Sequence, residues 1–293
     1  MKIFRALVLL LSAASLLHAS DATRKIAYVK GNAIFTANLD GGGVKKIATG
    51  ADPDLSADGT RVAFNTDDAK TPERHIAIAD LATGKVTRVP NIPSDNCFGP
   101  IWSPDDSHLI FYIFTDNDWY LGMIKPDGGD FHYVKKTESG HSLNSVAWVP
   151  DGHSFYCQDL ESLFLMTAEG AVQKKWSLEK LIPHSSFNSG AKFSVSPDGR
   201  TLLMDVDMDE NVSRKDWDGP PPSIWSFDIA SEKATRLTAK GLFAWEPEWL
   251  SATEFLCVIQ PVSAKEASIY RVSADGKVRQ PLIKNALTPS VSR

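Results

Sequence analysis

The chain has 293 residues, a formal net charge of −5 and 10% aromatic residues. The acidic balance, without a basic stripe along any segment, argues against nucleic acid as a partner. Three cysteines are too few, and odd in number, for a disulfide framework, so stability has to come from a buried core.

The first 19 residues have the layout of a secretory signal peptide. Lys2 and Arg5 form a basic end, residues 6–17 are apolar, and Ala19 offers a cleavage position. The apolar run is too short to span a bilayer as a helix. We therefore expect residues 1–19 to be removed and residues 20–293 to form a single domain. It would be periplasmic or secreted, and not an integral membrane protein.

A tight turn of the Ser-Pro-Asp-Gly type recurs along the chain, each time before a short apolar run. Its aspartates are Asp58, Asp105, Asp151 and Asp198, at steps of 47, 46 and 47 residues. A period of this size, with a turn in every unit, indicates a blade-repeat protein. Aspartate at such a turn hydrogen-bonds local backbone amides, so we interpret the four residues as structural.

A hairpin with a glycine-containing or polar turn, as at residues 40–43 and 127–129, recurs six times. Each unit is thus four strands, A to D, with the Ser-Pro-Asp-Gly turn between A and B. The first unit begins at its B strand, and residues 288–292 match the A-strand pattern of residues 52–56. An open ring would expose edges. We therefore predict an all-β, six-bladed β-propeller, closed by three N-terminal strands plus one C-terminal strand.

Units that read Pro-x-Trp-Ser-Pro-Asp, followed by an apolar strand and an Asp-Gly-Gly hairpin, resemble the TolB-type propeller repeat. The best matches are residues 100–111, 196–204 and 35–42, and the resemblance covers residues from about 24 to 293. It implies a propeller that lacks the N-terminal domain of TolB itself. Propellers of this type include periplasmic scaffold proteins, peptidase propellers and polysaccharide lyases. The length, which leaves no room for a C-terminal α/β-hydrolase domain, and the absence of a Gly-x-Ser-x-Gly motif together argue against a prolyl-oligopeptidase-like enzyme.

In such blades the A–B and C–D turns lie on one face of the disc, and the B–C and D–A loops lie on the other. The second face carries the irregular loops, where binding residues concentrate. Exposed aromatic side chains favour contacts with protein or sugar, although Trp245 has the alternative of packing between blades. We predict a binding rim made of Phe98, Asp116, Asp118, Trp119, His141, His184, Trp217 and Trp245.

Asp205, Asp207 and Asp209 begin what we expect to be the longest loop, residues 205–222. Alternating aspartates crowd oxygen ligands and would suit a metal cation such as Ca²⁺. The run lacks the Gly and the distal Glu of an EF-hand loop, so a solvated acidic loop is the alternative interpretation. No other cofactor is predicted.

Two functions from different classes follow. The first is a non-enzymatic protein-interaction or scaffold module of the cell envelope, which binds an envelope protein or a cell-wall component through the loop-rich face. The second is a metal-assisted lyase or hydrolase that acts on acidic carbohydrate in the central channel. It requires His141 and His184 to converge there with further ligands, whereas ordinary loop histidines are the alternative.

Overall fold

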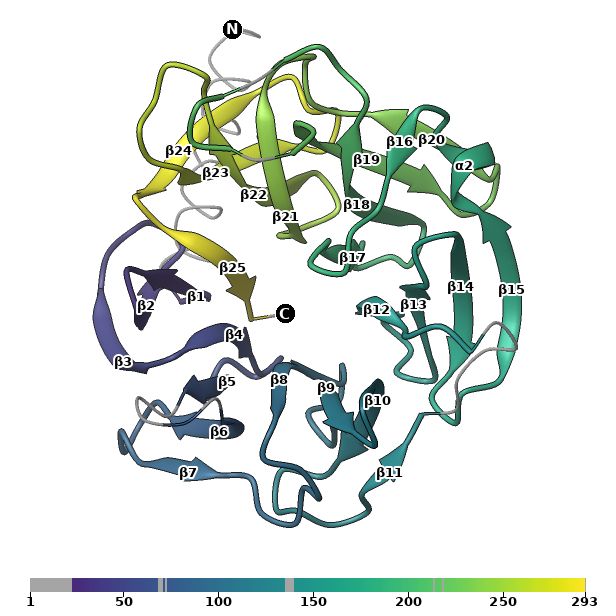
Figure 1. Ribbon diagram of the computed structural model, residues 1–293. Helices are drawn as coiled ribbons and strands as arrows, with labels where there is room; N and C mark the ends of the chain where they lie inside the picture. The colour runs from purple at the N-terminus through teal and green to yellow at the C-terminus, as the bar shows by residue number, and fades with distance from the viewer. Residues whose placement is uncertain are drawn as a thin grey trace, which may run out of the picture.

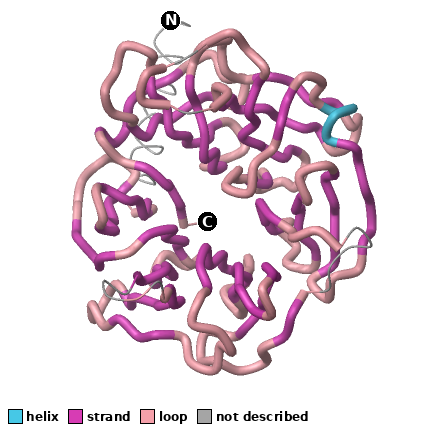
Figure 2. Tube along the Cα trace, viewed as in Figure 1, coloured by secondary structure: helices cyan, strands magenta, loops and turns pink. Residues whose placement is uncertain are grey.

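Six antiparallel sheets surround a central axis in this computed structural model, which describes residues 23–67, 71, 73–134, 140–212, 214–217 and 219–292 (Figure 1). The predicted six-bladed β-propeller is confirmed. Figure 2 shows how completely strands and turns make up the described backbone, with one short helix, α2 (Leu178–Leu181), after blade 4.

The blades are numbered in chain order, and their strands run from the inside outward. Blade 1 consists of β25 (Leu287–Val291), β1 (Lys25–Lys30), β2 (Ala33–Asn38) and β3 (Lys45–Thr49). Blade 2 consists of β4 (Ala51–Leu55), β5 (Arg61–Asp67), β6 (Arg74–Asp80) and β7 (Val86–Arg88). Blade 3 consists of β8 (Cys97–Trp102), β9 (Leu109–Thr115), β10 (Asp118–Ile124) and β11 (His132–Tyr133).

Blades 4 and 6 follow the same plan, whereas blade 5 is irregular on its inner side. There, two short strands, β16 (Ser185–Ser186) and β17 (Phe193–Val195), both pair with β18. Blade 4 consists of β12 (Asn144–Trp148), β13 (Ser154–Gln158), β14 (Ser162–Thr167) and β15 (Val172–Ser177). The outer strands of blade 5 are β18 (Thr201–Met208), β19 (Pro222–Asp228) and β20 (Lys233–Arg236). Blade 6 consists of β21 (Phe243–Trp249), β22 (Glu254–Gln260), β23 (Ser268–Ser273) and β24 (Arg279–Lys284).

Blade 1 joins the two ends of the described chain. Strand β25 pairs antiparallel with β1, so that Ile26 lies opposite Val291. The Arg24 guanidinium reinforces the junction by donating through Nη2 to the Ser292 carbonyl oxygen at 2.7 Å. The predicted closure by three N-terminal strands and one C-terminal strand is therefore confirmed.

The hydrophobic core lies between the blades. The described residues form six apolar clusters, and each cluster is filled by side chains of two neighbouring blades. Between blades 3 and 4, for example, Ile110 and Leu121 pack with Trp148 and Phe155. Because both faces of a blade are covered, the second strand is a continuous buried run, as in β13, where all five residues are buried.

The recurring aspartate turn is a local hydrogen-bond unit. In blade 2, the Ser56 hydroxyl donates to Asp58 Oδ1 at 2.7 Å, and the Thr60 N–H donates to the same oxygen at 2.9 Å. In blade 3, the Ser103 hydroxyl is the main cause that lowers the pKa of Asp105 to about 2. The structural role predicted for the turn aspartates is confirmed.

The inner strands share a β-bulge, a register shift seen where β4, β8, β12 and β21 meet their partners and also between β1 and β25. A bulge tolerates residues that cannot join the ladder, which explains how prolines 53, 100, 247 and 289 fit into inner strands. In five blades the bulge holds a residue with positive φ: Asp52 (48°), Gly99 (61°), Ser145 (58°), Glu246 (53°) and Thr288 (49°).

The loop expected at residues 205–222 begins later than predicted. Strand β18 continues to Met208, so Asp205 and Asp207 are strand residues. Their carboxylates can stay in the sheet because they accept hydrogen bonds from the inner segment of blade 5. The Lys192 N–H donates to Asp205 Oδ1 at 3.0 Å, and Asn188 Nδ2 donates to Asp207 Oδ2 at 2.8 Å.

Two expectations concern export and the membrane. The predicted signal peptide, residues 1–19, lies outside the described residues. Within the ranges given above, the structure contains no helix with the length and apolar character needed to cross a membrane.

Candidate functional site

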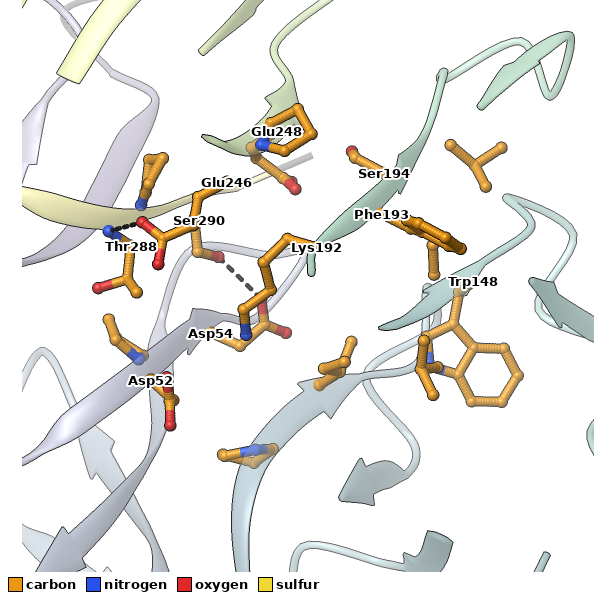
Figure 3. A pocket seen from close by; sticks show the side chains of 18 residues that line it. Asp52, Asp54, Trp148, Lys192, Phe193, Ser194, Glu246, Glu248, Thr288 and Ser290 are labelled. Carbon is orange, nitrogen blue, oxygen red and sulfur yellow. Dashed lines mark hydrogen bonds between the residues drawn. The ribbon is translucent and has the colours of Figure 1, made fainter. Parts of the chain in front are cut away.

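The six inner strands line a narrow central channel with a cavity of about 80 Å³ (Figure 3). Five half-buried charged residues line it: Asp52, Asp54, Lys192, Glu246 and Glu248. They are not among the predicted binding residues. A signal was present in the sequence, since the two aspartates flank Pro53 and the two glutamates flank Pro247 in the repeated inner-strand pattern.

Hydrogen bonds around this channel join each blade to the next. Asp54 is shared by three blades, because Ser290 Oγ of blade 1 donates to Oδ1 at 2.8 Å and the Trp102 N–H of blade 3 donates to Oδ2 at 2.7 Å. Glu246 Oε2 of blade 6 accepts the Thr288 N–H of blade 1 at 2.7 Å. The remaining joints are Ser145 N to Tyr112 Oη, Ser145 Oγ to the Ala191 carbonyl, and Trp249 N to Ser194 Oγ.

Burial changes the acid–base properties of the channel. It raises the pKa of Glu246 to about 7, and it raises to about 7 the pKa of Asp205, which accepts the Glu246 N–H at 2.9 Å. For Lys192, burial opposes the charged form, but nearby acidic groups, Asp52 first, outweigh burial and raise the pKa. Figure 3 shows Lys192 extended toward Asp54. The positive charge of Lys192 therefore balances part of the negative charge of the channel carboxylates. The hydrogen bonds around the channel hold the blades together.

A larger cavity of about 710 Å³ opens where loops of blades 2 to 5 meet. We call it the rim pocket. Its lining residues include Arg74, Phe98, Asp118, Trp119, His141 and Leu160. They come from the starts of β6, β8 and β10, from the loop that precedes β12, and from the loop between β13 and β14. All of these positions belong to the face that carries the B–C and D–A loops.

Aromatic rings and one guanidinium form the wall of the rim pocket. Phe98 stacks on Tyr112 with ring centroids 5.0 Å apart and meets Trp119 edge-on at 5.2 Å. Arg74 Cζ lies 4.3 Å from the Phe98 centroid and 5.6 Å from the Trp119 centroid. Arg74 Nε also donates to Asn96 Oδ1 at 3.0 Å, which fixes the guanidinium plane. Such cation–π stacking holds a planar donor group against an apolar surface.

The carboxylates of the rim pocket have local donors. Asp118 Oδ1 accepts the Trp119 N–H at 2.7 Å, and Asp159 Oδ1 accepts the Ser162 N–H at 2.8 Å. Asp159 is only 3% exposed. The two acidic groups therefore shape the loops, while Arg74 and the aromatic rings supply the wall.

Four of the predicted rim residues come together in this pocket, namely Phe98, Asp118, Trp119 and His141. Asp116 lies at the exposed tip of the β9–β10 turn, with a φ of 50°, and is not among the lining residues. Arg74 and Leu160 are not among the predicted binding residues. Arg74 begins a strand, and the importance of Leu160 depends on its backbone angle, which the residue type does not reveal.

The other predicted rim residues lie elsewhere. His184 is exposed and lines a separate cavity of about 380 Å³, together with Asp209. Trp217 contacts Trp245 and Phe243, with centroid separations of 5.4 Å and 5.5 Å. Trp245 is half-buried and packs against the core between blades 6 and 1, which is the packing alternative stated for it.

The three candidate metal ligands of blade 5 differ in environment. Asp205 is 5% exposed and bonded to the inner segment, Asp207 receives the Asn188 amide, and Asp209 is exposed beyond the end of β18. They are not among the described groups of three or more ligand atoms that lie within 4.8 Å of one another. Their metal binding stays a prediction.

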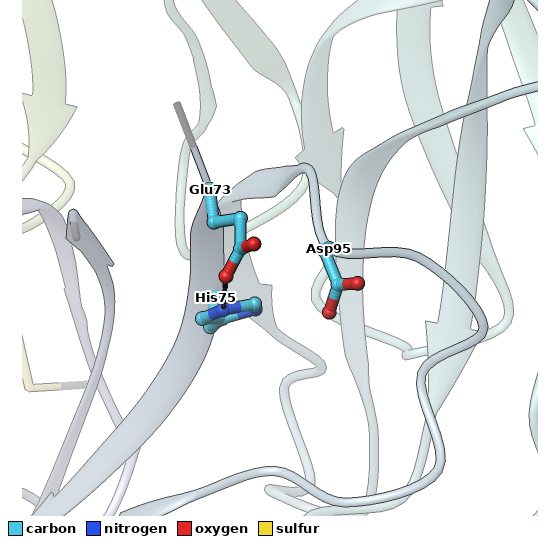
Figure 4. A group of neighbouring side chains, drawn as sticks. All are labelled: Glu73, His75 and Asp95. Carbon is cyan, nitrogen blue, oxygen red and sulfur yellow. Dashed lines mark ion pairs between the residues drawn. The ribbon is translucent and has the colours of Figure 1, made fainter. Parts of the chain in front are cut away.

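One such group exists among the described residues: Glu73, His75 and Asp95 (Figure 4). His75 Nε2 lies 3.4 Å from Glu73 Oε2, and Arg88 Nη2 lies 3.3 Å from Asp95 Oδ1. His75 Nδ1 is buried without a hydrogen-bond partner, whereas a metal-bound histidine normally donates its second N–H. Glu73 and Asp95 thus each have a partner of their own, His75 and Arg88 respectively.

The opposite face also has a cavity of about 580 Å³, which was not predicted from the sequence. The recurring turns of three blades supply Pro104, Pro150 and Pro197, and Trp249 and Leu250 complete its apolar side.

Comparisons with known proteins agree with the fold. The Tol-Pal system protein TolB of Francisella tularensis subsp. tularensis is 30% identical over 108 residues, which are 36% of this chain and 24% of that protein. The match thus spans about a quarter of the relative's length. The crystal structure of TolB from Acinetobacter baumannii matches 93% of this chain and 67% of that chain, with a TM-score of 0.72 and 17% identity. No family model matches the chain.

An oligogalacturonate lyase from Vibrio parahaemolyticus matches as well, with a TM-score of 0.56 and 15% identity, over 86% of this chain and 75% of that chain. At this identity the likeness concerns the fold alone. The blade arrangement and these matches define a six-bladed β-propeller. More specifically, the chain resembles TolB propellers, over part of its sequence and over nearly all of its fold.

Proposed function

We propose that the chain is an exported interaction module of the cell envelope, related to the Tol-Pal system, which binds a partner protein through the rim pocket. The periplasm is the proposed compartment, on the basis of the signal-peptide pattern of residues 1–19. The partial match to Tol-Pal system proteins supports the envelope assignment.

The observation that carries the proposal is the cluster of Arg74, Phe98 and Trp119 at a cavity of about 710 Å³. Aromatic residues and arginine are enriched at the centres of protein interfaces, where they dominate binding energy. Here they lie on loops and strand ends of a rigid scaffold, which is the usual placement of binding residues.

The competing lyase or hydrolase hypothesis rested on two convergent histidines. His141 lines the rim pocket and His184 lines a different cavity, and both side chains are exposed. Neither belongs to the described group of potential metal ligands. The alternative therefore has no observation that favours it over protein binding.

Site-specific photo-crosslinking in the native host tests the proposed function. A photoreactive amino acid at His141 should give a discrete adduct with an envelope protein, whereas the same group at Val172, exposed on the outermost strand of blade 4, should not. The additional substitution Trp119→Ala should reduce the adduct by about 10-fold or more, as for an interface hot spot. Identical adducts from both positions, or none from His141, would refute this function.

A further inference from the structure

Leu160 departs from two local rules at the edge of the rim pocket. Its residue surface is 48% exposed, although the side chain is apolar. Its φ is 75°, in the left-handed region where the Cβ of an ordinary residue crowds the backbone. The positive φ opposes folding, and the exposed side chain gains little from burial, so the stability of the fold gives no reason for a leucine here.

The loop around Leu160 is firmly held. Residues 159–161 connect β13 to β14, and Asp159 Oδ1 accepts the Ser162 N–H at 2.8 Å. Gln158 Oε1 accepts the Leu160 N–H at 2.5 Å, and Gln158 Nε2, which is buried, donates to Ser145 Oγ at 3.0 Å. The apolar side chain is therefore presented at a fixed place.

The same loop in other blades shows what the backbone prefers. Blade 1 has Gly31 at a φ of 64°, and blade 3 has Asp116 at 50° and Asn117 at 61°. These residue types tolerate positive φ, Gly because it lacks Cβ and Asp or Asn because of local hydrogen bonds. Blade 4 has leucine instead. A strained backbone angle that is kept with leucine, where the equivalent loops have Gly, Asp or Asn, points to a functional role for the leucine side chain.

Arg74, which also lines the pocket, shows which ligand would fit. Its Cζ lies 4.3 Å from the Phe98 ring centroid, and a planar guanidinium fork matches a carboxylate. Asp118 and Asp159 accept N–H groups of their own loops, so their oxygens have donors other than Arg74. The pocket thus presents a site for a carboxylate and, at Leu160, an apolar contact.

We propose that Leu160 and Arg74 are the specificity contacts of the rim pocket. Its ligand is an extended acidic segment of a partner protein in which an apolar side chain lies next to an Asp or Glu. The inference rests on the proposed function and names the partner chemistry. Leu160 packs on the apolar side chain, and Arg74 pairs with the carboxylate.

Selection from a phage-displayed library of linear peptides on the full-length protein tests this proposal. Enriched peptides should combine an apolar residue with a neighbouring acidic one. Leu160→Gly should weaken binding of the synthesised peptides by about 10-fold or more. The same substitution should raise the melting temperature by about 2–4 °C, because glycine relieves the positive φ. If Leu160 had only a structural role, its replacement would not weaken peptide binding while raising the melting temperature.

A matched control is Asn117→Gly, which makes the same backbone change in blade 3. It should leave peptide binding unchanged. Replacing the acidic residue of a peptide by its amide should weaken binding to the wild type, but not to Arg74→Gln. This double-mutant cycle isolates the pair.

The proposal is overturned if no acidic–apolar motif is enriched, or if Leu160→Gly binds the peptides as tightly as the wild type. Binding of soluble peptidoglycan fragments in place of peptides would also overturn it. A His141 adduct that persists undiminished in Leu160→Gly would refute the specificity contacts and leave the proposed interaction function intact.

Discussion

Asp54 is a carboxylate that three blades share. It takes the hydroxyl of Ser290 from the closing strand on one side and the backbone N–H of Trp102 on the other. The Leu55 N–H then donates to the same Ser290 hydroxyl at 2.9 Å. One side chain thus couples the closing strand to the start of the second and third blades, and its removal leaves donors without acceptors.

Asp54→Ala should lower the free energy of unfolding by about 3 kcal/mol, since an unsatisfied buried donor costs about 1–3 kcal/mol. Chemical denaturation measures this loss. The control is Asp40→Ala, which removes one carboxylate that accepts the Gly42 N–H at 2.8 Å in an exposed turn. We expect the control to lose less than about 1 kcal/mol. Equal losses for the two variants would show that the position at the channel confers no special role.

Glu246 and Asp205 predict an unusual pH dependence. Burial raises both pKa values to about 7, so the folded state binds more protons than the unfolded state at pH values above the ordinary carboxyl range. Their contribution to stability is therefore present at low pH and is lost as the pH rises toward 7. Asp105, whose pKa is lowered to about 2, acts in the opposite sense only in stronger acid.

In Glu246→Gln, the fall in unfolding free energy between pH 5 and 7 should be shallower than in the wild type, by up to about 1.4 kcal/mol per pH unit. The amide oxygen still accepts the Thr288 N–H, so the contact between blades is retained. Lys192 and Asp52 face the same group and remain unchanged. Denaturation curves over this pH range measure the slope. An unchanged slope would mean that Glu246 titrates at its ordinary pKa.

At the scale of strands, β25 shows how one short element completes the structure. Val291 lies 2% exposed in the cluster shared by blades 6 and 1, and Ser290 lies 4% exposed beside blade 2. The strand thus contributes a sheet edge, a packing surface and the hydrogen bonds to blade 2. Without it, β1 would become an unpaired edge.

Deletion of residues 286–293 should lower the melting temperature by about 10 °C or more, because a loss of several kcal/mol corresponds to about 2–4 °C for each kcal/mol in a domain of this size. Thermal unfolding followed by circular dichroism measures the shift. Leu287→Ser, at a 39% exposed position of the same strand, should change it by only about 2 °C. A deletion variant that melts like the wild type would contradict closure through β25.

The elements also show what the sequence could predict. The blade number and the closure follow from the spacing of the aspartate turns, because a ring repeats the same local pattern. The predicted start of the loop in blade 5 was wrong. Acidic residues such as Asp205 and Asp207 are uncommon in strands, and only the folded chain brings the Lys192 N–H and the Asn188 amide to their carboxylates.

The rim pocket was half predictable. Phe98, Trp119 and their neighbours lie at irregular loops and could be found from residue type. The stacking of Arg74 on Phe98 and the positive φ of Leu160 could not, because both are properties of the folded chain. The channel carboxylates are determined by bulges that repeat around the ring, which a search confined to the loops does not reach.

In the whole molecule, the residues that stabilise the ring and the residues proposed to bind a partner lie in different places. Its axis contains carboxylates, Asp54 and Glu246, that accept hydrogen bonds from neighbouring blades. One face carries the rim pocket, and the other carries an apolar cavity bordered by turn prolines. Substitutions at the axis should therefore alter stability first, whereas substitutions at the loop-rich face should alter binding with little change in melting.

The pairing of β25 with β1 also sets an order of events in time. Arg24 and Ser292, which meet at this junction, are 268 positions apart. A ribosome delivers β1, β2 and β3 before the other described strands, yet their missing neighbour emerges after all of those strands, so the first blade remains incomplete until then. Its bare edge can meanwhile pair with another chain, and the final joining pays a large loop-closure entropy in one late step. Refolding should therefore be slow, and the first blade should be the last to gain protection from hydrogen exchange.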